Sequence, residues 1–170
     1  MSQEINGTII VCVALRALGF QSEQPRPPCP KETEVKQTYS VTEFCVYTIR
    51  DGKELARLAK EGNPCSFEER KSWVTAGTLF QKAQLAKKAM PELFGDASDC
   101  RRLLFWGLLT DVTLRDGLTS FAVDRLRRFN GKHAPQELVL RSSGKQIAPN
   151  FIRPYAICRT PQFLDSKRHS

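Results

Sequence analysis

The sequence predicts an α+β fold: a small antiparallel, barrel-like β-structure in the C-terminal half, with helices from the middle of the chain packed on it. Apolar residues between positions 52 and 90 recur with the period of an α-helix, whereas from Arg102 onward apolar and polar residues alternate as in strands. Glycine-containing turn pairs interrupt this second half. The chain has 170 residues, 41% of them hydrophobic, which is enough to bury a core of its own.

Composition divides the chain into three segments. Residues 1–38 are expected to be an N-terminal segment that ends in a Pro-rich loop, residues 39–164 a single α+β domain, and residues 165–170 a frayed tail. Within the first segment, residues 8–18 form an apolar run. A helix is preferred there, because Thr8 at the start of the run suits a helix cap and Gly19 follows its end, but its β-branched residues also fit a strand.

The domain is expected to open with a strand followed by a helix. Residues 39–49 are rich in β-formers and predict the strand. Asp51 and Glu54, three positions apart, match a capping box, the pattern that marks the start of a helix. In such a box the first side chain accepts a hydrogen bond from a backbone N–H of the first helical turn. This pattern predicts a helix that ends before Gly62.

A second capping box, Ser66 and Glu69, predicts a long helical stretch that continues toward Met90. Gly77 is expected to divide the stretch into two pieces, because glycine weakens the interior of a helix. Residues 52–90 are therefore expected to be mostly helical.

The later half reads as strands joined by turns. Residues 103–114 predict a long strand with Gly107 in its middle, a position typical of a bulge. Asp116-Gly117 predicts a hairpin turn. Residues 119–129 fit a strand in their first half, while the spacing in their later half also fits a helix, and both alternatives stay open.

Two more strands are expected after this hairpin, over residues 137–141 and 151–158, with Pro154 confining the last one to an edge or entry position. Further turns are predicted at two residue pairs that end in glycine, Asn130-Gly131 and Ser143-Gly144. Alternation along the strands predicts a buried set: Leu104, Trp106, Leu108, Val112, Phe121, Val139 and Ile157.

The positive charge is confined to one part of the chain. The formal net charge is +8, residues 1–100 sum to zero, and the whole excess lies in residues 101–170, where ten of thirteen basic residues are arginine. Arginine grips phosphate with two parallel hydrogen bonds and stacks on planar rings. The segment therefore predicts a surface for a polyanionic partner.

The candidate nucleic-acid-binding residues are basic side chains of this segment and one tyrosine that lies between arginines in the sequence. Asp124 is the one acidic residue between Gly117 and Gln136, so carboxylates that would neutralise the arginines there are scarce. The candidates are Arg125, Arg127, Arg128, Lys132, Arg141, Lys145, Arg153 and Tyr155.

The order of elements resembles the PUA-like superfamily, which includes the ASCH and EVE domains. The resemblance covers about residues 39–160 and rests on the strand-helix opening YSVTEFCVYTIRDGKELARLA and on the strand RLLFWGLLTDVTL with its hairpin. It implies a small curved β-barrel that reads RNA or modified DNA, often by holding one base in an aromatic-lined pocket. No pocket residue of the family can be matched by position in this sequence.

The cysteines and the N-terminus indicate a cytoplasmic chain. Six cysteines occur without a C-x-x-C pair, and the chain begins Met1-Ser2-Gln3-Glu4, which lacks the basic start of a secretory signal. The apolar runs are too short to span a membrane. No cofactor, metal site or catalytic residue is expected from the motifs.

We therefore expect a nucleic-acid-binding module without catalysis of its own, for which the sequence leaves DNA and RNA open. One alternative is a regulatory protein whose basic face binds an acidic protein. A second is a metal-dependent enzyme acting on nucleic acid, with Asp111, Asp124 or Glu137 as metal ligands or acid–base groups.

Overall fold

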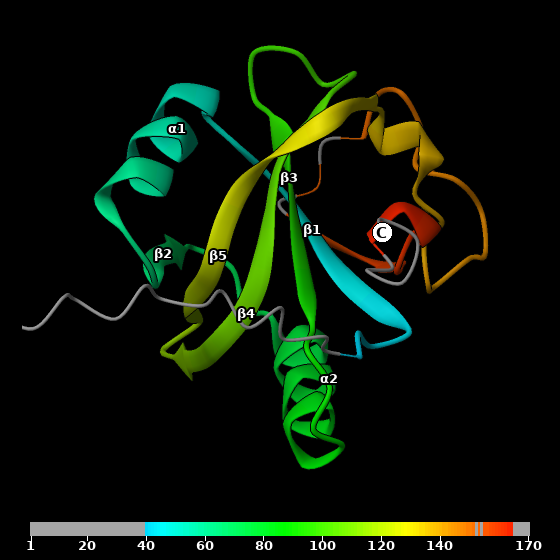
Figure 1. The fold of residues 1–170 in the computed structure, drawn as a ribbon. Coiled ribbons are helices and arrows are strands. Elements are labelled where there is room, and N and C mark those ends of the chain that lie inside the picture. The colour runs from blue at the N-terminus through cyan, green and yellow to red at the C-terminus, as the bar shows by residue number, and fades with distance from the viewer. Residues whose placement is uncertain (1–39, 152, 154, 165–170) are drawn as a thin grey trace, which may run out of the picture. The chain divides into compact units, whose positions relative to one another are not determined.

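The computed structural model describes residues 40–151, 153 and 155–164, which belong to one compact unit. The expectations for residues 1–38, for Pro154 and for the tail lie outside the described residues. The described part is a six-stranded sheet with two α-helices (Figure 1). Its elements are β1 (Phe44–Arg50), α1 (Gly52–Glu61), β2 (Cys65–Glu69), α2 (Val74–Leu85), β3 (Pro91–Asp96), β4 (Leu103–Arg115), β5 (Leu118–His133), β6 (Tyr155–Arg159) and the 3₁₀ turns η1 (Pro135–Glu137) and η2 (Gln162–Leu164).

The strand order is β2-β5-β4-β3-β1-β6, and all neighbours are antiparallel except β1 and β3, which run parallel. The α+β class is thereby confirmed. The sheet is not closed as a barrel, because β2 and β6 are its two ends and do not pair with each other, so that part of the prediction is wrong. The sheet is also not confined to the C-terminal half, since β1, β2 and β3 precede residue 100, and the parallel pair of β1 and β3 makes it mixed. Within the described residues, no helix has the length and apolar character needed to cross a membrane.

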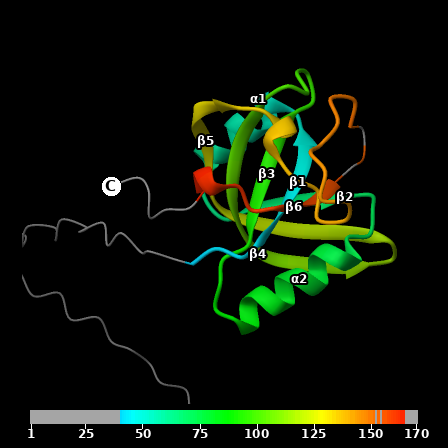
Figure 2. The same cartoon turned by 90° about the vertical axis from the view of Figure 1, so that its right-hand side faces the viewer.

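Each face of the sheet carries its own core. Alternation along β1 shows the division, since Val46 belongs to one core while Cys45 and Tyr47 belong to the other. We call the first the helix-side core, because residues of α1 and α2 contribute to it, among them Leu55 and Phe80. The second, the loop-side core, is completed by residues that follow β5, and Figure 2 shows the chain after β5 running along that side of the strands.

The first predicted strand and helix are confirmed. Residues 44–50 form β1, and the Asp51 carboxylate accepts hydrogen bonds from the backbone N–H groups of Lys53 and Glu54, both at 2.9 Å. These bonds satisfy donors that have no partner inside the first turn of α1. The helix ends at Glu61, and Gly62 has φ 119°, a value that favours glycine.

The second capping box is wrong, because residues 65–69 form strand β2 rather than the start of a helix. Cys65 and Phe67 are buried and alternate with exposed residues, and β2 pairs with β5 over five residues. Pairing with β5 and burial of one strand face outweigh the local helix signal. The helix itself begins later, at Val74, and continues through Gly77 instead of breaking there.

Gly77 is the point at which α2 packs closely on the sheet. A Cβ atom there would lie 3.5 Å from Leu114 Cδ1 and 3.9 Å from Val112 Cγ1, which is ordinary contact distance for packed side chains. The glycine therefore lies where the helix meets β4, and tertiary packing compensates for its low helix propensity.

The predicted β4–β5 hairpin is confirmed, and its second arm is a strand throughout rather than a helix in its later half. Asp116 and Gly117 have φ values of 49° and 78°, which is the geometry of a two-residue hairpin turn. β5 then remains a strand to His133, so the predicted turn at Asn130-Gly131 is wrong. The pairing of Leu103 with His133 shows that β4 still supplies hydrogen-bond partners at this end.

The segment after β5 is less regular than predicted. Residues 137–141 do not form a strand: η1 precedes Leu138, and isolated bridges join Val139 to Gln146 and Leu140 to Cys158. The turn at residues 143–144 is confirmed, with Gly144 N–H donating to Leu140 O at 2.9 Å. The last strand is shorter than predicted and covers residues 155–159.

The predicted core is confirmed in part. Leu104, Leu108 and Phe121 are buried. The remaining four are half-buried: Trp106, Val112, Val139 and Ile157. The largest fully buried side chain is Trp73, which stacks on Phe121 with ring centroids 4.4 Å apart.

Candidate nucleic-acid interface

A β-bulge in the middle of β5 decides which of its side chains share a face. Trp106 pairs with Arg127 and Leu108 with Asp124, so two residues of β5, Arg125 and Leu126, lie opposite Gly107 alone. A Cβ at Gly107 would lie 2.3 Å from Val123 Cγ1 and 2.8 Å from Asp124 O, which leaves no room for a side chain. The absence of a Cβ therefore permits the bulge, as the mid-strand glycine predicted.

The bulge places Arg125 at φ 55°, a conformation that is uncommon for residues other than glycine. It also changes the alternation, because Val123 and Leu126 both face the helix-side core although three positions separate them. The Leu126 N–H donates to Asn63 Oδ1 at 3.2 Å, which ties the bulge to the loop after α1. Beyond the bulge, Arg127 consequently lies on the loop-side face.

On that face, Arg127 stacks on an aromatic ring. Its guanidinium carbon lies 4.1 Å from the centroid of the Trp106 ring, which belongs to the neighbouring strand β4. This is a cation–π contact, and Trp106 is half-buried. The contact holds a planar, permanently charged group at the surface in a fixed orientation.

A row of aromatic rings continues from this contact along the end of β5. Trp106 and Phe129 have ring centroids 6.4 Å apart, and Phe129 and His133 have centroids 5.4 Å apart. The His133 ring in turn stacks on Phe163 of η2 at 3.9 Å. The chain after β6 thus meets the end of β5 and fixes the orientation of His133.

At this end of the hairpin the surface is hollowed. A recess of about 390 Å³ is lined by residues 101–103, before and at the start of β4, and by residues 131–134, at the end of β5. Three exposed cationic residues line it: Arg101, Arg102 and Lys132. Among the described residues, no carboxylate forms an ion pair with any of the three. Of these three, the sequence analysis had singled out only Lys132.

The carboxylates near the recess have partners of their own. Asp99 Oδ1 accepts the backbone N–H of Arg101 at 3.1 Å, and Glu137 Oε2 lies 3.5 Å from His133 Nδ1. Glu137 also accepts the backbone N–H of Ala134 at 2.7 Å. Because three cations outnumber these two carboxylates, the recess has an excess of positive charge, with Glu137 as the acidic group beside His133.

The other predicted cations of β5 lie differently. Arg128 pairs with Phe105 while Arg127 pairs with Trp106, so the alternation of the strand directs the two arginines to opposite faces. Arg125 Nε lies 3.7 Å from Asp124 Oδ2 at the bulge. The structure therefore brings Arg127 and Lys132 to the row of rings and the recess, and it separates Arg128 from them.

The remaining predicted residues lie beside β6. The Arg141 guanidinium lies 5.1 Å from the centroid of the Phe44 ring, and Lys145 is exposed in the same turn, where its carbonyl accepts the Leu140 N–H. Arg153 is exposed. Tyr155 packs against Trp73 with ring centroids 5.1 Å apart, so its ring contributes to the helix-side core.

The carboxylates considered for a metal-dependent enzyme do not converge. Asp111 accepts a hydrogen bond from the Thr113 hydroxyl at 3.0 Å, Asp124 lies beside Arg125, and Glu137 lies beside His133. Within the part of the chain that the structure describes, no three carboxylate, histidine or cysteine residues are grouped so that they could hold a metal ion.

A separate group of polar side chains is buried within the helix-side core. Glu92 is fully buried, and its Oε1 accepts a hydrogen bond from the Thr48 hydroxyl at 2.8 Å. Burial raises the pKa of Glu92 to about 8, while the Thr48 bond and the charge of Arg50 act in the opposite direction. The carboxyl is therefore protonated at neutral pH.

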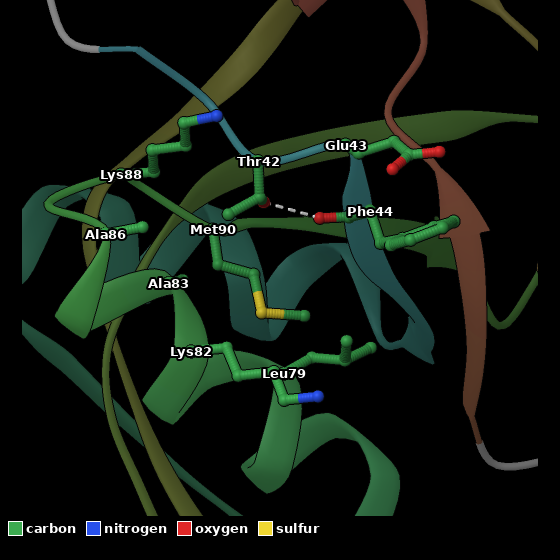
Figure 3. Close-up of a pocket in the computed structure, with 9 residues that line it drawn as sticks. All are labelled: Thr42, Glu43, Phe44, Leu79, Lys82, Ala83, Ala86, Lys88 and Met90. Atoms are coloured by element: carbon green, nitrogen blue, oxygen red, sulfur yellow. Dashed lines mark hydrogen bonds between the residues drawn. The ribbon is translucent and has the colours of Figure 1, made fainter.

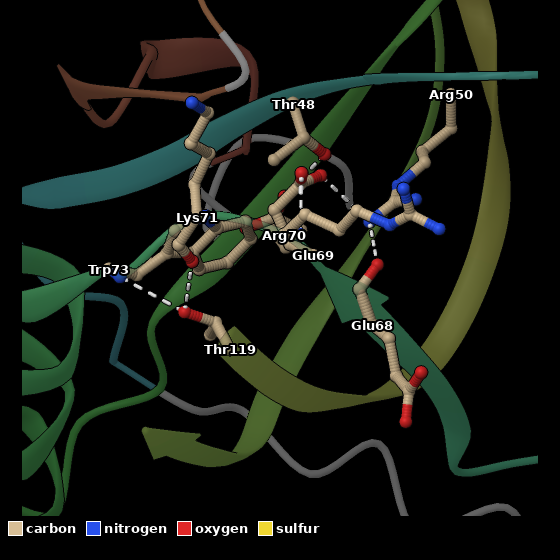
Figure 4. A network of polar contacts seen from close by, with 9 residues as sticks. Thr48, Arg50, Glu68, Glu69, Arg70, Lys71, Trp73 and Thr119 are labelled. Atoms are coloured by element: carbon tan, nitrogen blue, oxygen red, sulfur yellow. Dashed lines mark hydrogen bonds and ion pairs between the residues drawn. The ribbon is translucent and has the colours of Figure 1, made fainter. Parts of the chain in front are cut away.

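Figure 4 shows the surroundings of this group. Arg50 Nη2 donates to Glu68 O at 2.8 Å and to Glu69 Oε2 at 3.2 Å, which joins β1 to β2. The backbone N–H of Trp73 donates to Thr119 Oγ1 at 3.0 Å. These bonds connect strands and loops across the helix-side core, which indicates a structural role for the group.

One further cavity lies beside α2, with a volume of about 190 Å³ (Figure 3). Leu79 and Ala83 of α2 line one side, and Thr42, Phe44 and Met90 line the other. It is largely apolar, with lysines at its edge, and it contains none of the predicted binding residues.

The polar, charged and aromatic side chains described above gather at two places. One is the buried Glu92 group, and the other is the surface formed by Trp106, Arg127, Phe129, His133 and the recess. We call the latter the arginine–aromatic surface. No protein-family model matches the chain, and no curated protein or solved structure is significantly similar to it, so the site is interpreted from its own geometry.

Proposed function

We propose that the protein binds nucleic acid through the arginine–aromatic surface. The observation that carries the proposal is the stacking of Arg127 on Trp106, 4.1 Å from the ring centroid, on the sheet face whose aromatic row leads to the cationic recess. A stacked guanidinium offers a planar cation both to a phosphate and to the face of a base. Nucleic acids present these two groups at regular intervals.

The combination of rings and cations favours nucleic acid over an acidic protein. Carboxylates of a protein partner would pair with the cations but would make little use of half-buried rings such as Trp106 and Phe129. Bases gain about 1–3 kcal/mol each from stacking on aromatic side chains. The sequence resemblance to PUA-like domains stays a prediction and agrees with this class of partner.

The test compares an arginine that stacks on Trp106 with an arginine elsewhere. Arg127→Ala is expected to weaken binding of a short fluorescent oligonucleotide about fivefold or more, because a phosphate contact and its stacking are lost. The slope of log affinity against log salt should become shallower by about 0.7–0.9. Arg70→Ala, at an exposed position after β2, is the matched control and should leave affinity and slope unchanged.

Binding is measured by fluorescence polarisation of single-stranded DNA and RNA at low and at moderate salt. Equal losses in both arginine variants would mean that binding is diffuse and that the arginine–aromatic surface is not the site. Absence of binding by the wild type at low salt would overturn the proposal. Capture of a protein that survives nuclease treatment would then support the acidic-partner alternative.

A further inference from the structure

The cationic recess at the end of the β4–β5 hairpin differs from the rest of the arginine–aromatic surface in shape and in charge. Arg101 and Arg102 precede β4, and Lys132 lies near the end of β5. These segments are about thirty positions apart in sequence, and the pairing of Leu103 with His133 brings them together. The antiparallel ladder thus places three cations around one recess.

The charge of the recess suits a doubly charged anion better than a singly charged one. An internal phosphodiester carries one negative charge, whereas a phosphate monoester carries about −1.5 to −2 at neutral pH. No described carboxylate forms an ion pair with the three cations, and Asp99 is held by the backbone N–H of Arg101. Arg101, Arg102 and Lys132 outnumber the two carboxylates near the recess, Asp99 and Glu137, and they can supply several charged hydrogen bonds to the oxygens of a monoester.

The shape of the recess suits the end of a chain. Since liquid water occupies about 30 Å³ per molecule, a recess of about 390 Å³ has room for a phosphate and the sugar that carries it. A phosphate inside a strand is joined to the chain on both sides and has two free oxygens. A terminal phosphate has three, and it can enter a recess without bending the strand on its far side.

The row of aromatic rings indicates how the end of a strand could reach the recess. Trp106, Phe129 and His133 follow one another toward the recess, with Arg127 stacked on the first ring. A single strand that lies along these rings brings its end to Lys132 and Arg102. A phosphorylated peptide would supply the same phosphate but would have no bases for the rings, so the surface favours a nucleic acid.

We propose that the recess binds the terminal phosphate monoester of a nucleic-acid strand, so that the protein prefers phosphorylated ends to hydroxyl ends. This inference rests on the proposed nucleic-acid binding and adds to it the part of the strand that is recognised. The three basic residues contact the phosphate oxygens, while Arg127 and the rings hold the nucleotides that follow.

The experiment measures the affinity of the full chain for single-stranded oligonucleotides of one sequence that carry a 5′-phosphate, a 3′-phosphate or hydroxyl groups at both ends. One phosphorylated form is expected to bind about tenfold more tightly than the hydroxyl form, because each charged hydrogen bond contributes strongly. In the double variant R102A/K132A the ratio of the two affinities should fall toward one, because the phosphorylated form loses more affinity than the hydroxyl form. Arg70→Ala should retain the preference.

The outcomes separate this inference from the function on which it rests. Binding of all three oligonucleotides with equal affinity overturns the preference for phosphorylated ends and leaves the proposed function standing. Absence of binding to every oligonucleotide overturns both. A phosphoserine peptide that binds the wild type as tightly as the phosphorylated oligonucleotide, and loses affinity in the double variant, would assign the recess to a phosphorylated protein instead. The variants should fold, because the substituted residues are exposed. Thermal unfolding checks this.

Discussion

The two faces of the sheet differ in how their polar groups are used. In the helix-side core, Trp73 packs between Phe121 and Tyr155, and the buried Glu92 carboxyl accepts a hydrogen bond from Thr48. On the other face, the Trp106 ring is half-buried and carries a guanidinium. Both faces carry a core, but the helix side encloses its tryptophan completely, whereas the loop side leaves its tryptophan half-buried beneath a charged group. The comparison separates stability from binding.

The largest expected effect is on the stability of the helix-side core. Trp73→Ala should lower the free energy of unfolding by about 3–5 kcal/mol, because it removes a fully buried side chain and leaves a cavity beside Phe121. Chemical denaturation measures the change. Trp106→Ala is the matched substitution on the other face and should lower it less, since Trp106 is half-buried. Equal losses would show that the two faces do not differ as described.

A second effect concerns the pH dependence of stability. The pKa of Glu92 is raised by burial from 4.5 to about 8, so between these values the unfolded chain has released a proton that the folded chain retains. The free energy of unfolding should therefore decrease as pH rises through this window, by up to about 1.4 kcal/mol per pH unit from this group. Glu92→Gln keeps a neutral side chain of similar shape.

The pH effect is measured by urea denaturation of both proteins between pH 5 and pH 9. The wild type should lose stability relative to Glu92→Gln as pH increases, because only the wild type must either retain a proton or bury a charge. Parallel curves would contradict the assignment of the protonated carboxyl to the folded state.

A third, smaller effect concerns the bulge at Gly107, which should influence both stability and binding. Gly107→Ala places a methyl group 2.3 Å from Val123 Cγ1 and 2.8 Å from Asp124 O, so the bulge must shift. We expect a loss of about 1–3 kcal/mol in stability and weaker oligonucleotide binding, since Arg127 would lose its position over Trp106. Gly77→Ala is the control, because its new methyl group would be at ordinary contact distance. Unchanged binding in the Gly107 variant would separate the bulge from the surface.

The smallest effect isolates stacking from charge. Arg127→Lys retains the positive charge but loses the planar group that lies over Trp106. We expect little change in stability and an affinity for single strands about threefold lower, with an unchanged salt slope, because the number of phosphate contacts is the same. An unaltered affinity would indicate that Arg127 acts through charge alone.

Part of the candidate surface could be predicted from the sequence, because charge is a property of composition. The arginine excess pointed to residues 101–170, and Arg127 and Lys132 were named within it. Arg101 and Arg102 were not, because their relation to Lys132 depends on strand pairing over about thirty positions. Tyr155 was named for the arginines near it in sequence, yet its ring packs against Trp73.

The fold shows the same division between local and long-range information. Asp51 caps α1 as predicted, since a capping side chain bonds to backbone groups two and three residues away. Ser66 has an equivalent local pattern but lies in a strand, because β5 provides a partner and Phe67 a core to fill. Asn130 and Gly131 likewise have the composition of a turn but lie in β5.

The sequence by itself determined the α+β class, the first helix with its cap, the β4–β5 hairpin with its turn and the region that carries the charge. These follow from periods, short-range hydrogen bonds and composition. The tertiary structure alone decided that the sheet stays open, that Arg127 lies on Trp106 while Arg128 lies on the opposite face, and that Arg101 and Arg102 meet Lys132. The physical reason is that a bulge changes the face on which the next side chains of a strand lie, and its position depends on contacts with a distant strand.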